Sequence, residues 1–169
     1  MKCFIYLIML ILTSLLSSCA SYPRLISLPF DPGGQSLNSP AAELTPQISG
    51  RYIAFSSDRR GTQDIYLFDL ETKNLIDLPG LNSLDAIATY PSVDADGRHI
   101  VFAGSRQGRT AIYIYDRETR QSRSLTAALL AEVRNPTISA DGSRIAFESN
   151  AGGHWDILVY NQNGELLNR

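Results

Sequence analysis

A repeat with a period of 45 residues is the feature that most constrains the fold of this chain. Three prolines mark the repeat, Pro46, Pro91 and Pro136, and each begins a short strand-like run that ends in a tight turn. The turn is Asp96-Gly97 in the second unit and Asp141-Gly142 in the third, whereas the first unit is two residues shorter there. Self-similarity at this period indicates an array of equivalent structural units.

Each unit continues with two further runs of strand-forming residues. The first of these runs ends in Phe55, Phe102 or Phe147, and the second contains Ile65, Ile112 or Ile157, ten residues later. A last short run lies around 75–78, 121–125 and 165–167.

The chemistry of the repeat favours antiparallel sheets. Asp-Gly provides the positive φ angles of a two-residue hairpin turn, and Ile, Val, Tyr and Phe suit a pleated surface. Four antiparallel strands in a unit of 40 to 50 residues are typical of a β-propeller blade. We therefore predict an all-β fold of three four-stranded antiparallel repeats, 46–90, 91–135 and 136–169.

The repeat motif resembles that of one propeller family. It reads Pro-x-ϕ-Ser-x-Asp-Gly-x-x-Ile-Ala-Phe-x-Ser and then Asp-Ile-Tyr-ϕ-ϕ-Asp, where ϕ is apolar, and this pattern is similar to the TolB-type repeat. The third unit, from Pro136 to Tyr160, matches best, while the second carries Asp94 where Ser is usual and the first lacks the Asp of the turn. Because TolB-type propellers have six blades, the resemblance implies half a propeller. It also implies a place in the periplasmic Tol-Pal envelope system, although the chain has no counterpart of the N-terminal α/β domain of that family.

Three blades do not readily close a circle, so the two outermost blade faces are expected to stay apolar and to need a cover. Two chains could form a six-bladed ring. An open arc could be capped by residues 20–45 or by a partner. The reading frame could also be a fragment of a longer ancestor.

The first nineteen residues resemble the signal sequence of bacterial lipoproteins. Met1-Lys2 is a short positive region, and the mostly apolar run from Cys3 to Leu16 is shorter than the about 20 residues that a bilayer span needs. Leu16-Ser17-Ser18-Cys19 is similar to a lipobox, which implies a signal peptide of residues 1–18 and lipidation of Cys19. The alternatives are an ordinary signal peptide, cut at Ser-x-Ser or at Ala20, and an uncleaved anchor.

The residues after Cys19 predict where the domain is held. Residues 19–45 contain four of the eight prolines together with Gly33-Gly34, a composition typical of a tether. Ala20, rather than Asp, follows the cysteine. The sorting rule of lipoproteins then implies export to the outer membrane, facing the periplasm, if the host has one. Otherwise it implies the outer face of the cell membrane.

The chain lacks the patterns of most catalytic and cofactor sites. A formal charge of −2 gives no basic surface for nucleic acid. No Gly-x-Ser-x-Gly elbow accompanies His99 or His154, and Asp94-x-Asp96-Gly97 lacks the other ligands of a calcium loop. We predict no enzyme, no cofactor, no metal and no nucleic-acid partner.

The turns between the second and third strands predict a docking rim. They carry Arg59, Arg60, Arg106, Arg109, His154 and Trp155. This rim could meet an acidic partner or an anionic glycan. The alternative is a set of solvated loop tips, with Asp58 and Asp64 diluting the positive charge.

The sequence thus favours a lipid-anchored propeller that binds proteins as a scaffold of the cell envelope. Its partner would be an envelope protein or a peptidoglycan-associated protein, with a Tol-Pal-like role in transport or envelope integrity. The alternative function is an accessory propeller that recognises substrate or glycan for an envelope hydrolase. A structural fragment without a partner is the third hypothesis.

Overall fold

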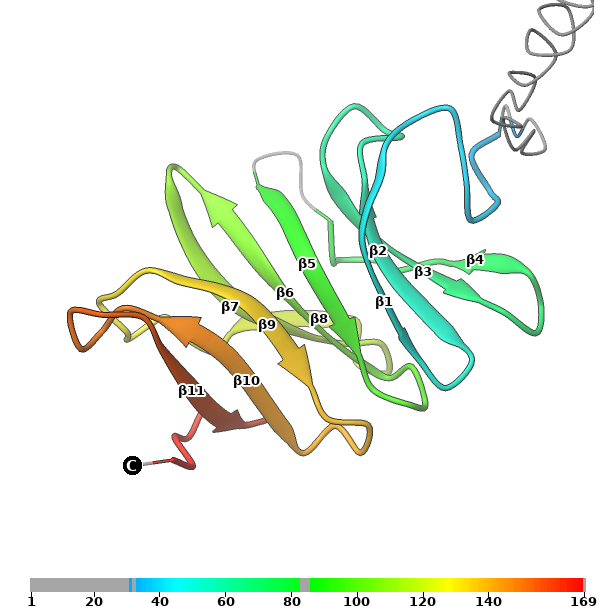
Figure 1. Ribbon diagram of the computed structural model, residues 1–169. Helices are drawn as coiled ribbons and strands as arrows, with labels where there is room; N and C mark the ends of the chain where they lie inside the picture. Colours follow the sequence, from blue (N-terminus) through cyan, green and yellow to red (C-terminus); the bar gives the residue numbers. More distant parts are fainter. Residues whose placement is uncertain (1–30, 32, 83–85, 169) are drawn as a thin grey trace, which may run out of the picture.

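The computed structural model of the protein describes residues 31, 33–82 and 86–168 (Figure 1). Eleven β-strands form three antiparallel sheets in this part of the chain. No helix within the described ranges is long and apolar enough to cross a membrane. The signal peptide and the lipidation site at Cys19 lie outside the described residues.

Each sheet corresponds to one sequence repeat and is called a blade. Blade 1 contains β1 (Glu43–Ser49), β2 (Tyr52–Ser57), β3 (Asp64–Asp69) and β4 (Asn74–Ile76). Blade 2 contains β5 (Ile87–Val93), β6 (His99–Arg106), β7 (Arg109–Asp116) and β8 (Gln121–Ser124). Blade 3 contains β9 (Val133–Ile138), β10 (Arg144–Ser149) and β11 (Asp156–Asn161). The predicted all-β fold of repeated antiparallel sheets is confirmed.

The marker prolines lie inside the first strand of each blade, not ahead of it. The residue before each proline has a positive φ, which is 49° at Thr45, 52° at Tyr90 and 51° at Asn135. The pairing register shifts at the same three places. Proline has no N–H to continue the ladder, so it is accommodated at a β-bulge, and the strand begins earlier than the sequence predicts.

The fourth strand expected around 165–167 is absent as a strand and is replaced by a single bridge, from Tyr160 to Leu166. Beyond that bridge the side chain of Asn168 takes the position of a partner strand. Its amide oxygen accepts the N–H of Val159 at 2.7 Å, and its amide nitrogen donates to the carbonyl of Ile157 at 2.9 Å. One side chain therefore satisfies backbone groups that a fourth strand would otherwise pair.

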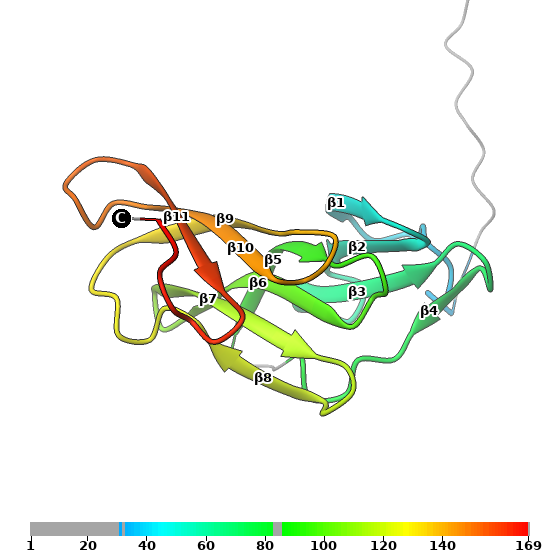
Figure 2. The same ribbon diagram turned by 90° about the horizontal axis from the view of Figure 1, so that it is seen from below.

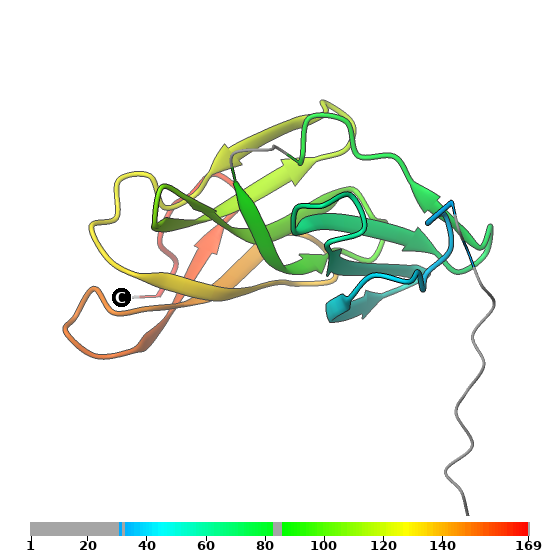
Figure 3. The ribbon, with the colours of Figure 1, turned by 90° about the horizontal axis from the view of Figure 1, so that it is seen from above.

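Successive blades pack face to face, and blade 2 lies between blades 1 and 3 in all three views (Figures 1, 2 and 3). We call the face turned to the next blade the forward face and the opposite one the back face. The first interface joins Ala54, Ile65 and Leu67 to Val93, Ile100, Phe102 and Tyr115. The second joins Val101, Ile112 and Ile114 to Val133, Ile138, Ile145 and Phe147. These side chains are almost fully buried, so the two interfaces form the core.

Polar contacts fix how one blade lies on the next. The side-chain oxygen of Gln47 accepts the N–H of Val93 at 2.8 Å, and one repeat later the hydroxyl of Ser92 accepts the N–H of Ile138 at 3.1 Å. The turn glycine of blade 2 adds a close apolar approach between blades. A Cβ on Gly97 would lie 2.5 Å from the ring of Tyr52 in the preceding blade.

We expect Gly97→Ala to destabilise the protein by about 3 kcal/mol, because the added methyl group clashes with Tyr52 and the φ of 71° disfavours a side chain. Gly108→Ala is the matched control. Its φ of 76° is similar, but its Cβ would meet nothing within 4 Å, so a loss of about 1 kcal/mol is expected. Urea unfolding measures both values, and equal losses would contradict the proposed close approach.

Candidate functional site

The forward face of blade 3 is uncovered in the structure. Ile157 is 56% exposed, whereas the equivalent Ile65 and Ile112 are 1% and 0% exposed because the next blade covers them. Ala146 and Val159 lie on the same face and are half-buried. This face keeps the apolar residues of a blade interface but has no blade against it.

Charged residues border these apolar side chains. Arg134 and Glu148 form an ion pair at 2.5 Å. The position of Arg134 is occupied by Leu44 in blade 1 and by Thr89 in blade 2. The position of Glu148 is occupied by Ser56 and Ala103 in the same two blades. The hydrogen bonds from Asn135 and then Arg134 lower the pKa of the Glu148 carboxyl. The guanidinium of Arg134 also lies 3.9 Å from the ring centre of Trp155, which is 42% exposed.

We call Arg134, Ala146, Glu148, Trp155, Ile157 and Val159 the end patch. Exposed Trp and Arg side chains beside an apolar surface are the residues that dominate protein–protein interfaces. The patch can therefore bind a protein surface.

The back face of blade 1 is covered by residues 34–42, which we call the strap. The covered side chains are Ile53, Phe55, Tyr66, Phe68 and Leu75, and Leu37 of the strap packs against them. The strap belongs to the segment predicted to be a tether. One end of the arc is thus capped by the chain itself.

Arg59 fastens the strap to blade 1. Its guanidinium donates to the carbonyls of Gly34, Ser36 and Leu37 at 2.8 to 3.1 Å and forms an ion pair with Glu43 at 2.8 Å. The side chain is only 5% exposed and stacks on Phe55 and Tyr66. Arg59 is therefore a buried structural residue.

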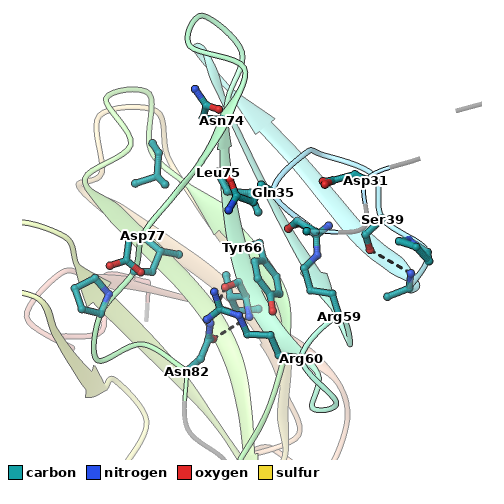
Figure 4. Close-up of a pocket in the computed structure, with 18 of the residues that line it drawn as sticks. Asp31, Gln35, Ser39, Arg59, Arg60, Tyr66, Asn74, Leu75, Asp77 and Asn82 are labelled. Atoms are coloured by element: carbon teal, nitrogen blue, oxygen red, sulfur yellow. Dashed lines mark hydrogen bonds between the residues drawn. The ribbon is translucent and has the colours of Figure 1, made fainter. Parts of the chain in front are cut away.

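A cleft of about 770 Å³ lies between the strap and the outer half of blade 1 (Figure 4). Asp31, Gln35 and Ser39 line one side, and the run from Asn74 to Gly80 lines another. The hydroxyl of Tyr66, on β3, is buried and has no hydrogen-bond partner among the described residues. Burial, together with the nearby Asp64 carboxylate, raises the pKa of Tyr66.

The structure separates the residues of the predicted rim. Arg59 is buried under the strap, and the neighbouring Arg60 is exposed beside the cleft, 5.9 Å from the ring centre of Tyr66. Arg106 and Arg109 are exposed at the β6–β7 turn, and Arg109 donates to the carbonyl of Leu129 at 3.4 Å.

The last two rim residues lie at the far end of the arc. His154 is exposed and lies 3.0 Å from Asp156, and Trp155 belongs to the end patch. The six residues thus divide among a strap contact, a cleft, a loop and an end face.

His99 occupies the interface between blades 2 and 3. Its Nδ1 lies 2.7 Å from the buried carboxylate of Asp94, and its Nε2 lies 3.8 Å from Asp116. Burial raises the pKa of Asp94. In the described part of the chain, no three His, Cys, Asp or Glu side chains are grouped as metal ligands.

The sequence analysis did not identify Tyr66, Arg134 or Glu148 as functional candidates. A comparison between repeats would have indicated Arg134 and Glu148, because both stand where the other units have uncharged residues. The Tyr66 hydroxyl gives no such signal, because the equivalent residue of blade 2 is also a tyrosine, Tyr113.

The family model of the TolB beta propeller domain matches residues 34–169. TolB from Acinetobacter baumannii is 27% identical, with a TM-score of 0.61, over 77% of this chain and 32% of that protein. A TolB candidate from Agrobacterium tumefaciens is 22% identical, with a TM-score of 0.56, over 68% and 40% of the two chains. The propeller domain of the Trilobed protease from Pyrococcus furiosus is 17% identical, with a TM-score of 0.54, over 76% and 42%. A comparison with curated protein sequences gives no significant match.

We expect Arg59→Ala to lower the free energy of unfolding by about 3 kcal/mol, because Glu43 would lose its partner and three strap carbonyls would lose their donor. Protease cleavage within the strap should accelerate in the same variant. Arg60→Ala, at the neighbouring exposed position, should change stability by less than about 0.5 kcal/mol. Urea unfolding and limited proteolysis measure both effects, and a similar response of the two variants would refute the role of Arg59.

Proposed function

Since the chain belongs to the TolB β-propeller domain family, we propose that it is a protein-binding module of the bacterial cell envelope and that the end patch is its docking surface. The exposure of Ile157, at a position that is buried in the other two blades, carries this proposal. The chain spans about a third of the length of the Acinetobacter TolB that it matches, so a Tol-Pal-like role in transport or envelope integrity is part of the proposal.

The proposed attachment is a lipid on Cys19, in the outer membrane if the host has one and otherwise on the outer face of the cell membrane. Residues 20–33 separate that cysteine from the strap, and fully extended they would reach at most about 50 Å. The strap then joins the tether to blade 1. This arrangement places the end patch at the end of the arc away from the anchored segment.

The proposed partner presents an apolar sheet face with charges that complement Arg134 and Glu148. The forward faces of blades 1 and 2 support this chemistry, because an apolar back face packs on each of them. For example, Ile100 and Phe102 on the back face of blade 2 pack on the forward face of blade 1. In a six-bladed ring a second copy would have to offer the back of blade 1, which the strap and the Glu43–Arg59 pair already cover. We therefore favour another envelope protein, including a peptidoglycan-associated one, over a six-bladed ring of two copies.

The alternative function is recognition of substrate or glycan for an envelope hydrolase. The cleft over blade 1 favours it, because the cleft offers hydrogen-bonding side chains at the other end of the arc. In either function this chain binds, and a catalytic step would belong to the partner.

A photo-crosslinking amino acid at Thr137, on the face of the end patch, should form one main adduct in intact envelopes. Trp155→Ala and Ile157→Asp should each lower its yield about tenfold or more, because hot-spot residues contribute about 2 kcal/mol or more to binding. The same probe at Leu130, which is 90% exposed on a connection, is the control and should give no specific adduct. Denaturing gels and mass spectrometry identify the adduct.

An adduct that joins the end patch of one copy to blade 1 of a second copy would support the ring. Equal labelling from positions 137 and 130, or an adduct that both substitutions leave unchanged, would rule out the end patch as the docking surface.

A further inference from the structure

The cleft over blade 1 is built like a ligand site and is separate from the end patch. Its volume of about 770 Å³ lies within the range of small-molecule sites. Its walls come from separate parts of the chain, because the strap forms one side while β3, β4 and residues 77–82 form the rest. Figure 4 shows Tyr66 between these two walls, with Arg60 and Asn82 nearby.

The hydroxyl of Tyr66 is the strongest indication that this cleft binds a ligand. The residue is only 6% exposed, and its hydroxyl has no partner in the described part of the chain. An unsatisfied buried polar group costs about 1 to 3 kcal/mol, so such a group is expected to gain a partner when a ligand binds. Both Arg59 and Arg60 lie over the Tyr66 ring, at 4.7 and 5.9 Å from its centre. Because Arg59 is bonded to the strap and Arg60 is exposed, ligand access to the hydroxyl requires the Arg60 side chain to move.

The charges that line the cleft give it no excess of positive charge. Asp31 and Asp77 face Arg60, because the guanidinium of Arg59 is already bonded to the strap and paired with Glu43. An anionic ligand would therefore gain no net attraction there. The cleft suits an uncharged ligand that both donates and accepts hydrogen bonds.

The side chains that remain available match hydroxyl groups. The Asp77 carboxylate accepts hydrogen bonds, the guanidinium of Arg60 donates them, and the amide of Gln35 does both. Two further groups keep only part of their capacity: one oxygen of Asp31 already accepts the N–H of Ser36, and the amide nitrogen of Asn74 already donates to the carbonyl of Thr72. Asn82 is excluded, since its amide already bonds the backbone N–H and carbonyl of Ile65 at 2.9 Å. We propose that this cleft binds an uncharged oligosaccharide, with the Tyr66 hydroxyl bonded to one of its hydroxyl groups.

An extended peptide is the competing ligand, and the cleft suits it less well. A peptide that adds to the edge of a sheet binds mainly through the backbone of a long exposed strand. The strand beside the cleft, β4, has only three residues, and Pro79 soon after it has no N–H to offer. Polar side chains rather than a strand edge dominate the cleft.

The test measures binding of neutral tetrasaccharides of N-acetylglucosamine, glucose with α linkages and glucose with β linkages to the full chain. The chain is held in lauryldimethylamine oxide, because this detergent carries no sugar headgroup. Calorimetry and thermal unfolding should detect at least one of the three, since a ligand that binds only the folded state raises the melting temperature. An uncharged acetylated tetra-alanine amide serves as the peptide probe and should not bind.

Tyr66→Phe should weaken saccharide binding about five- to tenfold, the value of one lost hydrogen bond. Without saccharide the same variant should melt above the wild type, because it removes the unsatisfied hydroxyl. The matched control is Tyr113→Phe at the equivalent position of blade 2, which should leave saccharide affinity unchanged. Asp77→Asn should weaken binding, while Asp96→Asn on blade 2 should not.

Failure of all three saccharides to bind would overturn the proposal, and so would binding that Tyr66→Phe leaves intact. Binding of the peptide alone would replace the saccharide with a polypeptide. Each of these results is independent of adduct formation at the end patch, so the proposed docking function stands or falls separately.

Discussion

The packing of a forward face on a back face is the interaction on which the rest of the structure depends. Each blade has two apolar faces, and a sheet of this kind is stable only when both are covered. Blade 2 meets this requirement through its neighbours, as the burial of Ile112 and Phe102 shows. Blades 1 and 3 each have one face that no blade covers. The functional candidates of this protein are found at those two faces.

The two ends of the arc meet the same requirement by different chemistry. At blade 1 the strap covers the back face with Leu37, and its carbonyls accept hydrogen bonds from Arg59. The buried ion pair between Arg59 and Glu43 completes this cover. At blade 3 no segment among the described residues covers the face, and the Arg134–Glu148 pair makes part of it polar. A polar outer face is what terminal repeats of an array need for solubility. The outer face of blade 3 is only partly polar, because the apolar side chains of Ile157 and Trp155 remain exposed on it.

The repeat could be predicted from the sequence because its signals are local. Strand runs, Asp-Gly turns and the period determine the blades, and the same contacts recur wherever the motif recurs. Capping by residues 20–45 was one of the alternatives that the sequence left open, but the contact that fastens the strap could not be predicted, since Arg59 lies in a turn that by itself indicates an exposed rim. Its burial depends on residues 34–42, which have no repeat signal. The missing fourth strand of blade 3 has no repeat signal either, since the backbone groups of Ile157 and Val159 are bonded there by one side chain, that of Asn168.

The separation of the two ends has a mechanical consequence. Val93 and Ile138 are each held by a side chain of the preceding blade, and the turn of Gly97 lies against Tyr52, so neighbouring blades cannot slide without breaking several contacts. A stack of this kind acts as a rigid spacer. On the proposed anchoring, the tether enters at blade 1, next to the cleft, while the end patch lies at blade 3. A ligand near the anchor and a protein at the far end could then be bound together without competing for the same surface.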